Sequence, residues 1–320
     1  MSIVAIVHPT GLLGTEIRET LERRHELWRE LRLLSDREDE IGSLTDVRGT
    51  VSMVTKLEKD DFDGIDVAFF CGGIQETRPL LVDRPPAMTA VVLSVDAGPE
   101  DGVPVVAAVN IDKACGSEIL LCPHPAAVLL AHLVHPLRAY GPRRAVGTFL
   151  EPASVGGKPA LDEVFEQTRA ILTFAPDQPR EVFRTQMAFN VIPGHRGEHV
   201  AAHVAALTEG EIEVYVQLLR CGVFHSFGAS VHLTLTEDPG EAAVRKALAA
   251  HPLNDASPDP DLLGMIDAAG RDEVLLGPVE AVAGLPGTYR IWAVMDNLTC
   301  GAAVNAVHIL EAVSGAVMVN

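Results

Sequence analysis

A glycine-containing turn follows the first apolar segment of the chain, Ser2–Val7, and it has the composition of a phosphate-binding turn. Residues 8–14 read His-Pro-Thr-Gly-Leu-Leu-Gly, and a helical apolar pattern then continues to Arg24. Glycines in such a turn let the backbone bend tightly and approach a pyrophosphate at a helix N-terminus. Gly11 and Gly14 supply the last two glycines of a G-x-x-G-x-x-G turn, but His8 stands where the first belongs. The pattern predicts a nucleotide-binding turn in which phosphate binding is weakened by the side chain at the first glycine position.

Two charged residues follow the second predicted strand, Leu31–Leu34. Asp36 lies close to the offset of roughly 20 residues at which a carboxylate takes the adenosine ribose hydroxyls, which favours NAD. The adjacent Arg37 could equally accept a 2′-phosphate, which would favour NADP. NAD or NADP is therefore the candidate cofactor. The alternative is that the turn persists as architecture, because its glycines also serve helix packing.

The elements that must position these residues are short β-branched runs separated by polar or helical segments. Strands separated by crossovers form a parallel sheet covered on both faces. The predicted fold class is α/β, a Rossmann-type doubly wound parallel sheet. Beyond the two strands already named, its strands are expected at Val51–Val54, Val67–Phe70, Ala90–Val95 and Val105–Val109.

The second half of the chain has an α+β pattern, because polar and apolar residues alternate there as in an antiparallel sheet. Leu253–Pro260 is rich in Pro, Asp and Asn and is predicted as a surface loop. Helices are expected at Ala126–Leu137, Leu161–Leu172 and Asn297–Val313, and strands at Arg144–Leu150, Glu211–Leu219 and Val231–Thr236. The predicted domains are 1–122 for the nucleotide, 123–296 for a catalytic-like and dimerisation domain, and 297–320 for a helix returning to the first domain.

Composition narrows the classes of function. A chain of 320 residues fits two domains of ordinary size. The formal net charge of −19 repels nucleic acid and anionic lipid, so neither is an expected partner. No apolar run reaches the roughly 18 residues of a membrane span, and the N-terminus lacks an export signal. Five cysteines without a metal-ligand rhythm fit reduced thiols, and a cytoplasmic location is expected.

Several segments resemble the aspartate-semialdehyde dehydrogenase family, and more narrowly its cysteine-less Usg-type branch. Residues 296–307 read Asp-Asn-Leu-Thr-Cys-Gly-Ala-Ala-Val-Asn-Ala-Val, similar to the family's D-N-L-x-K-G-A-A-x-N-A-V. Residues 103–110 resemble V-P-L-V-V-P-E-V-N with one residue fewer, and residues 189–193 match F-N-x-I-P. Residues 154–158, with 166–169, are similar to the family's glycine turn and dimer-side helix. The matches run from the first strand to the last helix.

The resemblance implies a homodimer in which a cysteine thiolate attacks aspartyl phosphate, a histidine manages the proton, and NADPH reduces the thioester. It also implies a small-molecule ligand and a set of cofactor contacts. Together with the turn and the second strand, the candidate cofactor-binding residues are Thr10, Gly11, Leu12, Leu13, Gly14, Asp36, Arg37, Gly72, Ser154 and Asn297.

The family's nucleophile and base are replaced in this sequence. The nucleophile motif N-P-N-C-[ST] aligns so that Pro125 stands at the cysteine position, with Cys122 three residues earlier and predicted to be a small buried residue. The signature R-x-P-V-F-x-G-H-S-x-S-V aligns on residues 220–231, keeps Arg220 and puts Phe227 at the histidine position. A proline and a phenylalanine can neither attack a carbonyl nor exchange a proton. His225, two residues earlier, would lie on the same face of an extended strand.

Other family positions also differ. Residues 94–98, which follow the fifth predicted strand, offer no cation for a phosphate. The family's substrate-orienting glutamine appears as Glu151. Arg220 could still clamp a carboxylate. The candidate substrate-binding residues are Arg220, Glu151 and Asn110.

Three histidines, His195, His199 and His203, recur every four residues. On a helix at most two of their imidazoles could share one ion, because eight residues rise roughly 12 Å. A solvated helix face is the favoured interpretation, and no metal site is predicted.

The leading hypothesis is a member of this family that has lost cysteine-based acyl transfer and binds a nucleotide or a small carboxylate. The first alternative is an active NAD(P)-dependent reductase of altered chemistry, with Glu151 or His225 as acid or base. The second is a dimeric interaction scaffold without a small-molecule ligand.

Overall fold

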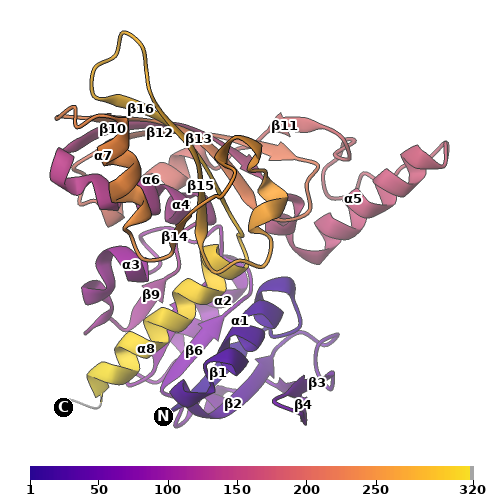
Figure 1. The fold of residues 1–320 in the computed structure, drawn as a ribbon. Helices are drawn as coiled ribbons and strands as arrows, with labels where there is room; N and C mark the ends of the chain where they lie inside the picture. Colours follow the sequence, from indigo (N-terminus) through magenta and orange to yellow (C-terminus); the bar gives the residue numbers. More distant parts are fainter. Residues whose placement is uncertain (318–320) are drawn as a thin grey trace. The chain divides into compact units, whose positions relative to one another are not determined.

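The computed structural model describes residues 1–317, which divide into two compact units (Figure 1). The first unit contains residues 1–124 together with the chain from Ala302 onward, and the second contains Pro125–Gly301. In the described part of the chain, each unit is built around a seven-stranded sheet.

The sheet of the first unit is parallel throughout and has the strand order β5-β2-β1-β6-β7-β9-β8. Val4 in its central strand pairs with Leu31 on one side and Val67 on the other. The predicted Rossmann-type α/β fold is therefore confirmed. The strands are β1 (Ser2–Val7), β2 (Trp28–Ser35), β5 (Thr55–Lys56), β6 (Val67–Phe70), β7 (Thr89–Val92), β8 (Val103–Pro104) and β9 (Ile119–Leu121).

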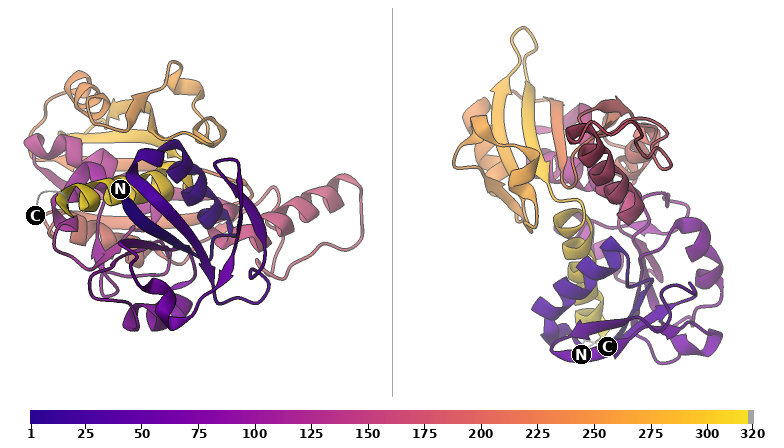
Figure 2. Two further views of the ribbon diagram at one scale, coloured as in Figure 1. Left: turned by 90° about the horizontal axis from the view of Figure 1, so that it is seen from below. Right: turned by 90° about the vertical axis from the view of Figure 1, so that its right-hand side faces the viewer.

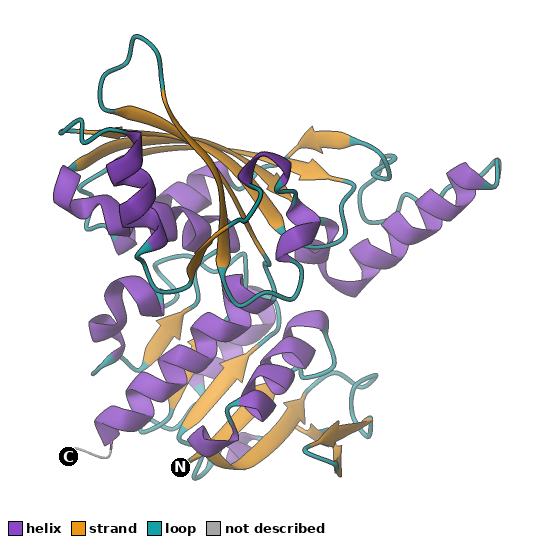
Figure 3. Ribbon diagram, in the orientation of Figure 1, coloured by secondary structure: helices purple, strands orange, loops and turns teal. Residues whose placement is uncertain are grey.

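Alternate residues of β1 serve two hydrophobic cores, as the period of a strand requires. Val4 and Ile6 pack in a cluster with Ile17 of the first helix and Leu310 of the last. Ala5 and its odd-numbered neighbours pack on the opposite face. The helices of this unit, seen along the chain in Figure 3, are α1 (Leu12–Arg23), α2 (Ile74–Val82), α3 (Ala107–Asn110) and α8 (Asn305–Val317).

Two predicted strands of the first unit differ in the structure. Val51–Val54 belongs mostly to β4 (Thr50–Met53), which pairs antiparallel with β3 (Leu44–Val47) in a separate two-stranded sheet. The segment Val105–Val109 is also not a strand, because β8 ends at Pro104 and helix α3 follows. The sequence prediction missed β9, whose three residues are too few to show a period.

The sheet of the second unit is mixed, with the order β11-β12-β10-β13-β16-β15-β14. Strands β10 and β12 pair in parallel, whereas β10 and β13 are antiparallel. The predicted α+β character is confirmed. The strands are β10 (Pro142–Glu151), β11 (Val191–Pro193), β12 (Glu213–Cys221), β13 (Phe227–Leu235), β14 (Asn254–Ala256), β15 (Val274–Ala281) and β16 (Thr288–Met295).

The helices of the second unit are α4 (Pro125–Val134), α5 (Gly157–Leu172), α6 (Gly197–Leu207) and α7 (Glu241–Ala249). All ten residues of α4 are buried, and this helix contacts α6 and β13. On β13, Ala229, Val231 and Leu233 are fully buried, whereas the residues between them are more exposed. Figure 2 shows that α5 extends away from the sheet of its own unit.

Three boundaries in the second half also differ from the prediction. The loop Leu253–Pro260 includes the short strand β14. Helix α4 stops at Val134 and a 3-10 turn follows, because Pro136 has no backbone N–H to continue the helix. The C-terminal helix begins as a π-helical segment at Thr299–Val304 before α8. Within residues 1–317, no helix is both long and apolar enough to cross a membrane.

Candidate functional site

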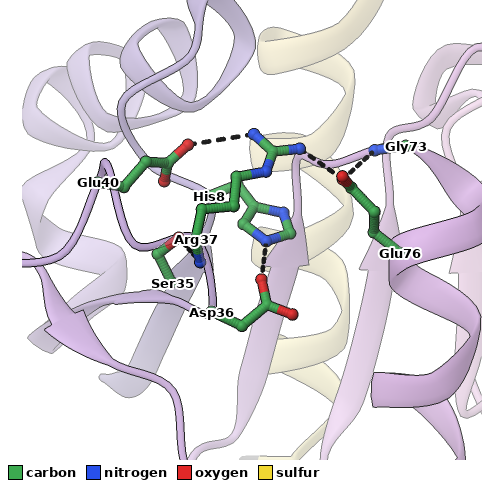
Figure 4. Close-up of polar contacts among 7 residues, drawn as sticks. All are labelled: His8, Ser35, Asp36, Arg37, Glu40, Gly73 and Glu76. Carbon is green, nitrogen blue, oxygen red and sulfur yellow. Dashed lines mark hydrogen bonds and ion pairs between the residues drawn. The ribbon is translucent and has the colours of Figure 1, made fainter.

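The turn after β1 is occupied by its own histidine (Figure 4). His8 adopts a left-handed backbone conformation with φ of 60°, and its side chain is buried. Glycine adopts this conformation most readily, which agrees with a glycine position in the phosphate-binding pattern. The imidazole Nε2 lies 2.7 Å from Oδ1 of Asp36, just after β2. The predicted ribose carboxylate therefore already has a partner.

Two glycines make room for His8. An added Cβ on Gly72, after β6, would lie 2.2 Å from Nδ1 of the imidazole. An added Cβ on Gly14 would lie 2.5 Å from the carbonyl oxygen of His8. Real atoms do not approach so closely, so a side chain at Gly14 would displace the backbone of His8, and one at Gly72 would displace its imidazole. The imidazole fills the space beside Gly72.

Arg37 lies between two carboxylates (Figure 4). Its guanidinium donates to Glu40 at 3.1 Å and to Glu76, in the first turn of α2, at 2.5 Å. The hydrogen bond from Arg37 holds the pKa of Glu76 below its usual value. Glu76 also accepts a hydrogen bond from the backbone N–H of Gly73.

Helix α1 begins after Gly11 with no acidic residue in its first turn. Of the predicted nucleotide residues, Gly14, Gly72 and Asp36 lie against His8, and Arg37 pairs with Glu40 and Glu76. Thr10 and Gly11 lie in the turn, and Leu12 and Leu13 begin α1.

A second polar site lies where β10 and β12 end. Their parallel register places Glu151 directly beside Arg220. The Glu151 side chain is 4% exposed, and its Oε1 lies 3.2 Å from Nε of Arg220 and 3.9 Å from Nη1 of Arg196. A cavity of about 230 Å³ opens beside these groups, with Val182 and Phe183 in its wall. The sequence prediction missed Arg196, which follows β11 and carries no motif.

Ser154 and Asn297, the predicted cofactor contacts of the second unit, meet each other. Oδ1 of Asn297 accepts hydrogen bonds from Oγ of Ser154 at 3.0 Å and from the backbone N–H of Ser226 at 3.1 Å. Ser226 stands at the glycine of the family signature and has φ of 75°. This left-handed residue precedes β13, so His225 is not on an extended strand, and the expectation that it shares a face with Phe227 is wrong.

The residues at the family's nucleophile and base positions are packed in the core. Pro125 opens α4 and is buried against the close turn at Gly301, where an added Cβ would lie 3.1 Å from the Pro125 ring. Phe227 is fully buried at the start of β13. Within their unit, neither side chain offers a nucleophile or a proton acceptor.

Cys122 and Asn110 are both engaged in local structure of the first unit. Burial raises the pKa of the Cys122 thiol to about 12, and the Asn305 amide contacts Sγ at 3.5 Å. The prediction that Cys122 is a buried residue is confirmed. The side chain of Asn110 accepts from the N–H of Val106 and donates to the carbonyl of Pro104. It holds the chain between β8 and α3.

The histidines of α6 do not form a solvated face. The rings of His199 and His203 stack edge to face with centroids 4.5 Å apart, and His203 is fully buried. His195 precedes α6 and is exposed, so two of the three predicted histidines lie on the helix, and the expected solvated face is wrong for the buried His203. Among residues 1–317 there is no group of three or more potential ligands that could hold a metal ion.

Known proteins resemble the chain over nearly its whole length. A USG-1 protein homolog of Azotobacter vinelandii is 29% identical over 327 residues, which cover 96% of each chain. An aspartate-semialdehyde dehydrogenase of Bacillus subtilis is 25% identical, also with 96% of each chain covered. The structure of a probable aspartate-semialdehyde dehydrogenase from Pseudomonas aeruginosa superposes with a TM-score of 0.91 at 27% identity, covering 97% of this chain and 98% of that one. No family model matches.

Proposed function

We propose that this aspartate-semialdehyde dehydrogenase-like chain does not carry out cysteine-based reduction of an acyl phosphate, and that it binds a small carboxylate in its second unit. The observation that supports the first half is the packing of Pro125 and Phe227. Both positions, which the family signature gives to a thiol and an imidazole, hold buried apolar side chains.

Cys122 is a poor substitute nucleophile. A thiol attacks as its thiolate, and a pKa of about 12 leaves roughly one thiol in 10,000 ionised at pH 8. Asn305 in turn is tied to the backbone of residues 105 and 107, so the amide beside the sulfur is fixed. These contacts favour a structural role for Cys122 over catalysis.

The cavity beside Glu151 has the charge to take an anion. Arg196 and Arg220 carry two positive charges against the single carboxylate of Glu151, which leaves a net charge of +1. Within the described residues, Arg220 donates to Glu151 through Nε, so its terminal nitrogens remain able to form a bidentate pair. Both guanidinium groups are partly exposed. A small carboxylate whose methylene carbons face Val182 and Phe183 fits this wall.

Turnover decides the first half of the proposal. Purified chain is incubated with aspartate semialdehyde, phosphate and NAD or NADP, and reduced nucleotide is followed by absorbance. We expect no turnover above a blank, either in the chain or in a Cys122→Ser variant. Nucleotide reduction that the Cys122→Ser substitution abolishes would refute the proposal.

Calorimetric titration with succinate or L-aspartate tests the second half. We expect binding that an Arg220→Gln substitution weakens at least about tenfold, since it removes the bidentate donor. The matched control is Arg144→Gln, an arginine at the opposite end of β10 that pairs with exposed Glu213. Equal binding by the chain and by folded Arg220→Gln would exclude this cavity as the carboxylate site.

A second candidate function, homodimerisation, is favoured by one exposed apolar surface. We define this surface by residues of α5 and the segment that follows it. The exposed fractions are 58% for Phe165, 68% for Leu172, 94% for Phe174, 69% for Phe189 and 54% for Val191. Exposed large aromatic side chains that follow one another along the sequence are typical of protein interfaces. A second copy of the chain is the proposed occupant, in agreement with the dimer that the resemblance implies.

Sedimentation equilibrium tests the dimer. We expect a mass of two chains, and a shift to the monomer in Phe174→Asp, because a buried charge is costly at an interface. Leu262→Asp is the matched control, since Leu262 is 79% exposed elsewhere in the same unit. A monomeric parent chain, or a Phe174→Asp variant as dimeric as the control, would exclude this surface.

A further inference from the structure

The cofactor that the resemblance implies, NAD or NADP, does not fit the residues at the turn after β1. We infer that the His8 side chain is a built-in occupant of the dinucleotide site, and that the chain binds neither NAD nor NADP there. The inference concerns the first unit alone and does not depend on the carboxylate site proposed for the second.

The His8 side chain blocks the turn sterically. A dinucleotide needs close backbone approach at the first glycine of its turn. Here that position carries an imidazole that is almost completely buried and packs on Gly72. The neighbouring Pro9 also has no N–H to offer a phosphate. The space that the pyrophosphate of a dinucleotide would occupy is therefore filled by protein atoms.

His8 also engages the carboxylate that would bind the ribose. A carboxylate after the second strand normally accepts the adenosine ribose hydroxyls. Asp36 holds that place, but Oδ1 lies 2.7 Å from Nε2 of His8. The hydrogen bond inside the protein is already formed before any ligand arrives, so a ribose would have to replace it.

Negative charge surrounds the turn. Asp36 beside His8, and Glu40 and Glu76 beside Arg37, contribute three carboxylates against one guanidinium, a net charge of −2 when the imidazole is neutral. The guanidinium that could accept a 2′-phosphate is held by Glu40 and Glu76 instead. Phosphate groups are repelled by such an environment. Figure 4 shows both carboxylates directed at the guanidinium.

The inference makes His8→Gly a gain-of-function substitution. Glycine adopts the left-handed backbone of residue 8 without strain, removes the imidazole from Gly72 and releases Asp36. Because Asp36 would then face the ribose hydroxyls, we expect the variant to prefer NAD to NADP.

Fluorescence titration with NADH and NADPH is the test, in the full chain with folding checked by circular dichroism. We expect no saturable binding by the parent chain up to about 1 mM nucleotide, and at least about tenfold tighter NADH binding by His8→Gly. His8→Asn, which tolerates the same backbone region with a shorter side chain, is the second variant. His25→Ala, an exposed histidine of the same unit, is the control and should match the parent.

Two results would overturn the inference. One is parent binding of either nucleotide with a dissociation constant below about 100 µM. The other is a folded His8→Gly chain that binds no nucleotide even when Glu76→Gln removes a neighbouring charge, since the imidazole would then not be the obstacle. Titration of the same samples with a carboxylate measures binding in the second unit separately. The nucleotide inference and the carboxylate proposal can therefore be refuted independently of each other.

Discussion

At the turn after β1 a buried imidazole lies against Gly72 and contacts the carboxylate of Asp36, whereas at the ends of β10 and β12 a buried carboxylate lies beside two guanidinium groups and an open cavity. Both regions occupy positions that the family resemblance assigns to ligands. In the first, protein atoms take the ligand's space and the surplus charge is negative. In the second, the space remains and the surplus charge is positive.

The difference shows that pairing charges within a site does not by itself close it. Glu151 and Asp36 both have a side-chain partner within the protein, yet Arg196 and Arg220 lie beside a cavity of about 230 Å³. A site is closed when the side chain that pairs with its carboxylate also fills the space for the ligand. The left-handed histidine does so, whereas the partly exposed Arg196 and Arg220 do not.

The strongest test of this comparison removes the cation from the second site. Arg220→Met should lower the free energy of unfolding by about 2–3 kcal/mol, because buried Glu151 would lose its hydrogen-bonded cation, which lies nearer to it than Arg196 does. Urea denaturation measures the change. In the double variant Glu151→Gln/Arg220→Met most of the loss should be recovered, and a double variant as unstable as the single one would contradict the ion-pair explanation.

The cavity wall offers the next test. Glu163 of α5 is buried and accepts hydrogen bonds from the N–H groups of Val182 and Phe183, which line the cavity. Glu163→Ala leaves two amides without their acceptor and should cost about 2 kcal/mol of unfolding free energy. It should also weaken succinate binding, as the wall loosens. Glu163→Gln keeps one acceptor oxygen and should lose less; equal losses would argue against this network.

His132 is another buried histidine, and its surroundings differ from those of His8. His132 of α4 contacts no carboxylate among the described residues. Its ring packs on His251, which also stacks with His135. His135 and Arg138 both belong to the 3-10 turn that follows α4. Burial lowers the pKa of His132 to about 3. Between pH 6.5 and 3 the unfolded chain therefore binds the extra proton, and stability falls as the pH falls.

The free energy of unfolding should fall by about 1 kcal/mol for each pH unit below pH 6.5. Urea denaturation at several pH values measures it. His132→Gln should flatten this part of the profile, whereas His25→Ala, an exposed histidine of the first unit, should leave it unchanged. A profile that stays as steep in His132→Gln would assign the acid sensitivity to other groups.

The comparison also shows where sequence reasoning reaches its limit. Local patterns predicted the turn at residues 8–14, the place of Asp36, and a proline and a phenylalanine at the family's nucleophile and base positions, because each depends on residue type at a fixed offset. The contacts of His8 could not, since Gly72 and Asp36 reach it through the register of three parallel strands. Arg196 and Ser226 were missed because a loop cation and a left-handed serine carry no periodic signal.

The smallest expected effect lies at the other end of the β10 and β12 pair. Arg144 and Glu213 face each other in the same parallel register as Glu151 and Arg220, but both side chains are more than half exposed. Water and salt screen an exposed pair, and holding two long side chains costs entropy. Arg144→Gln should therefore leave the urea midpoint unchanged within error at 0.15 M salt, roughly physiological ionic strength. A loss approaching that of Arg220→Met would mean that pairing along these strands, and not burial of Glu151, sets the stability of the second site.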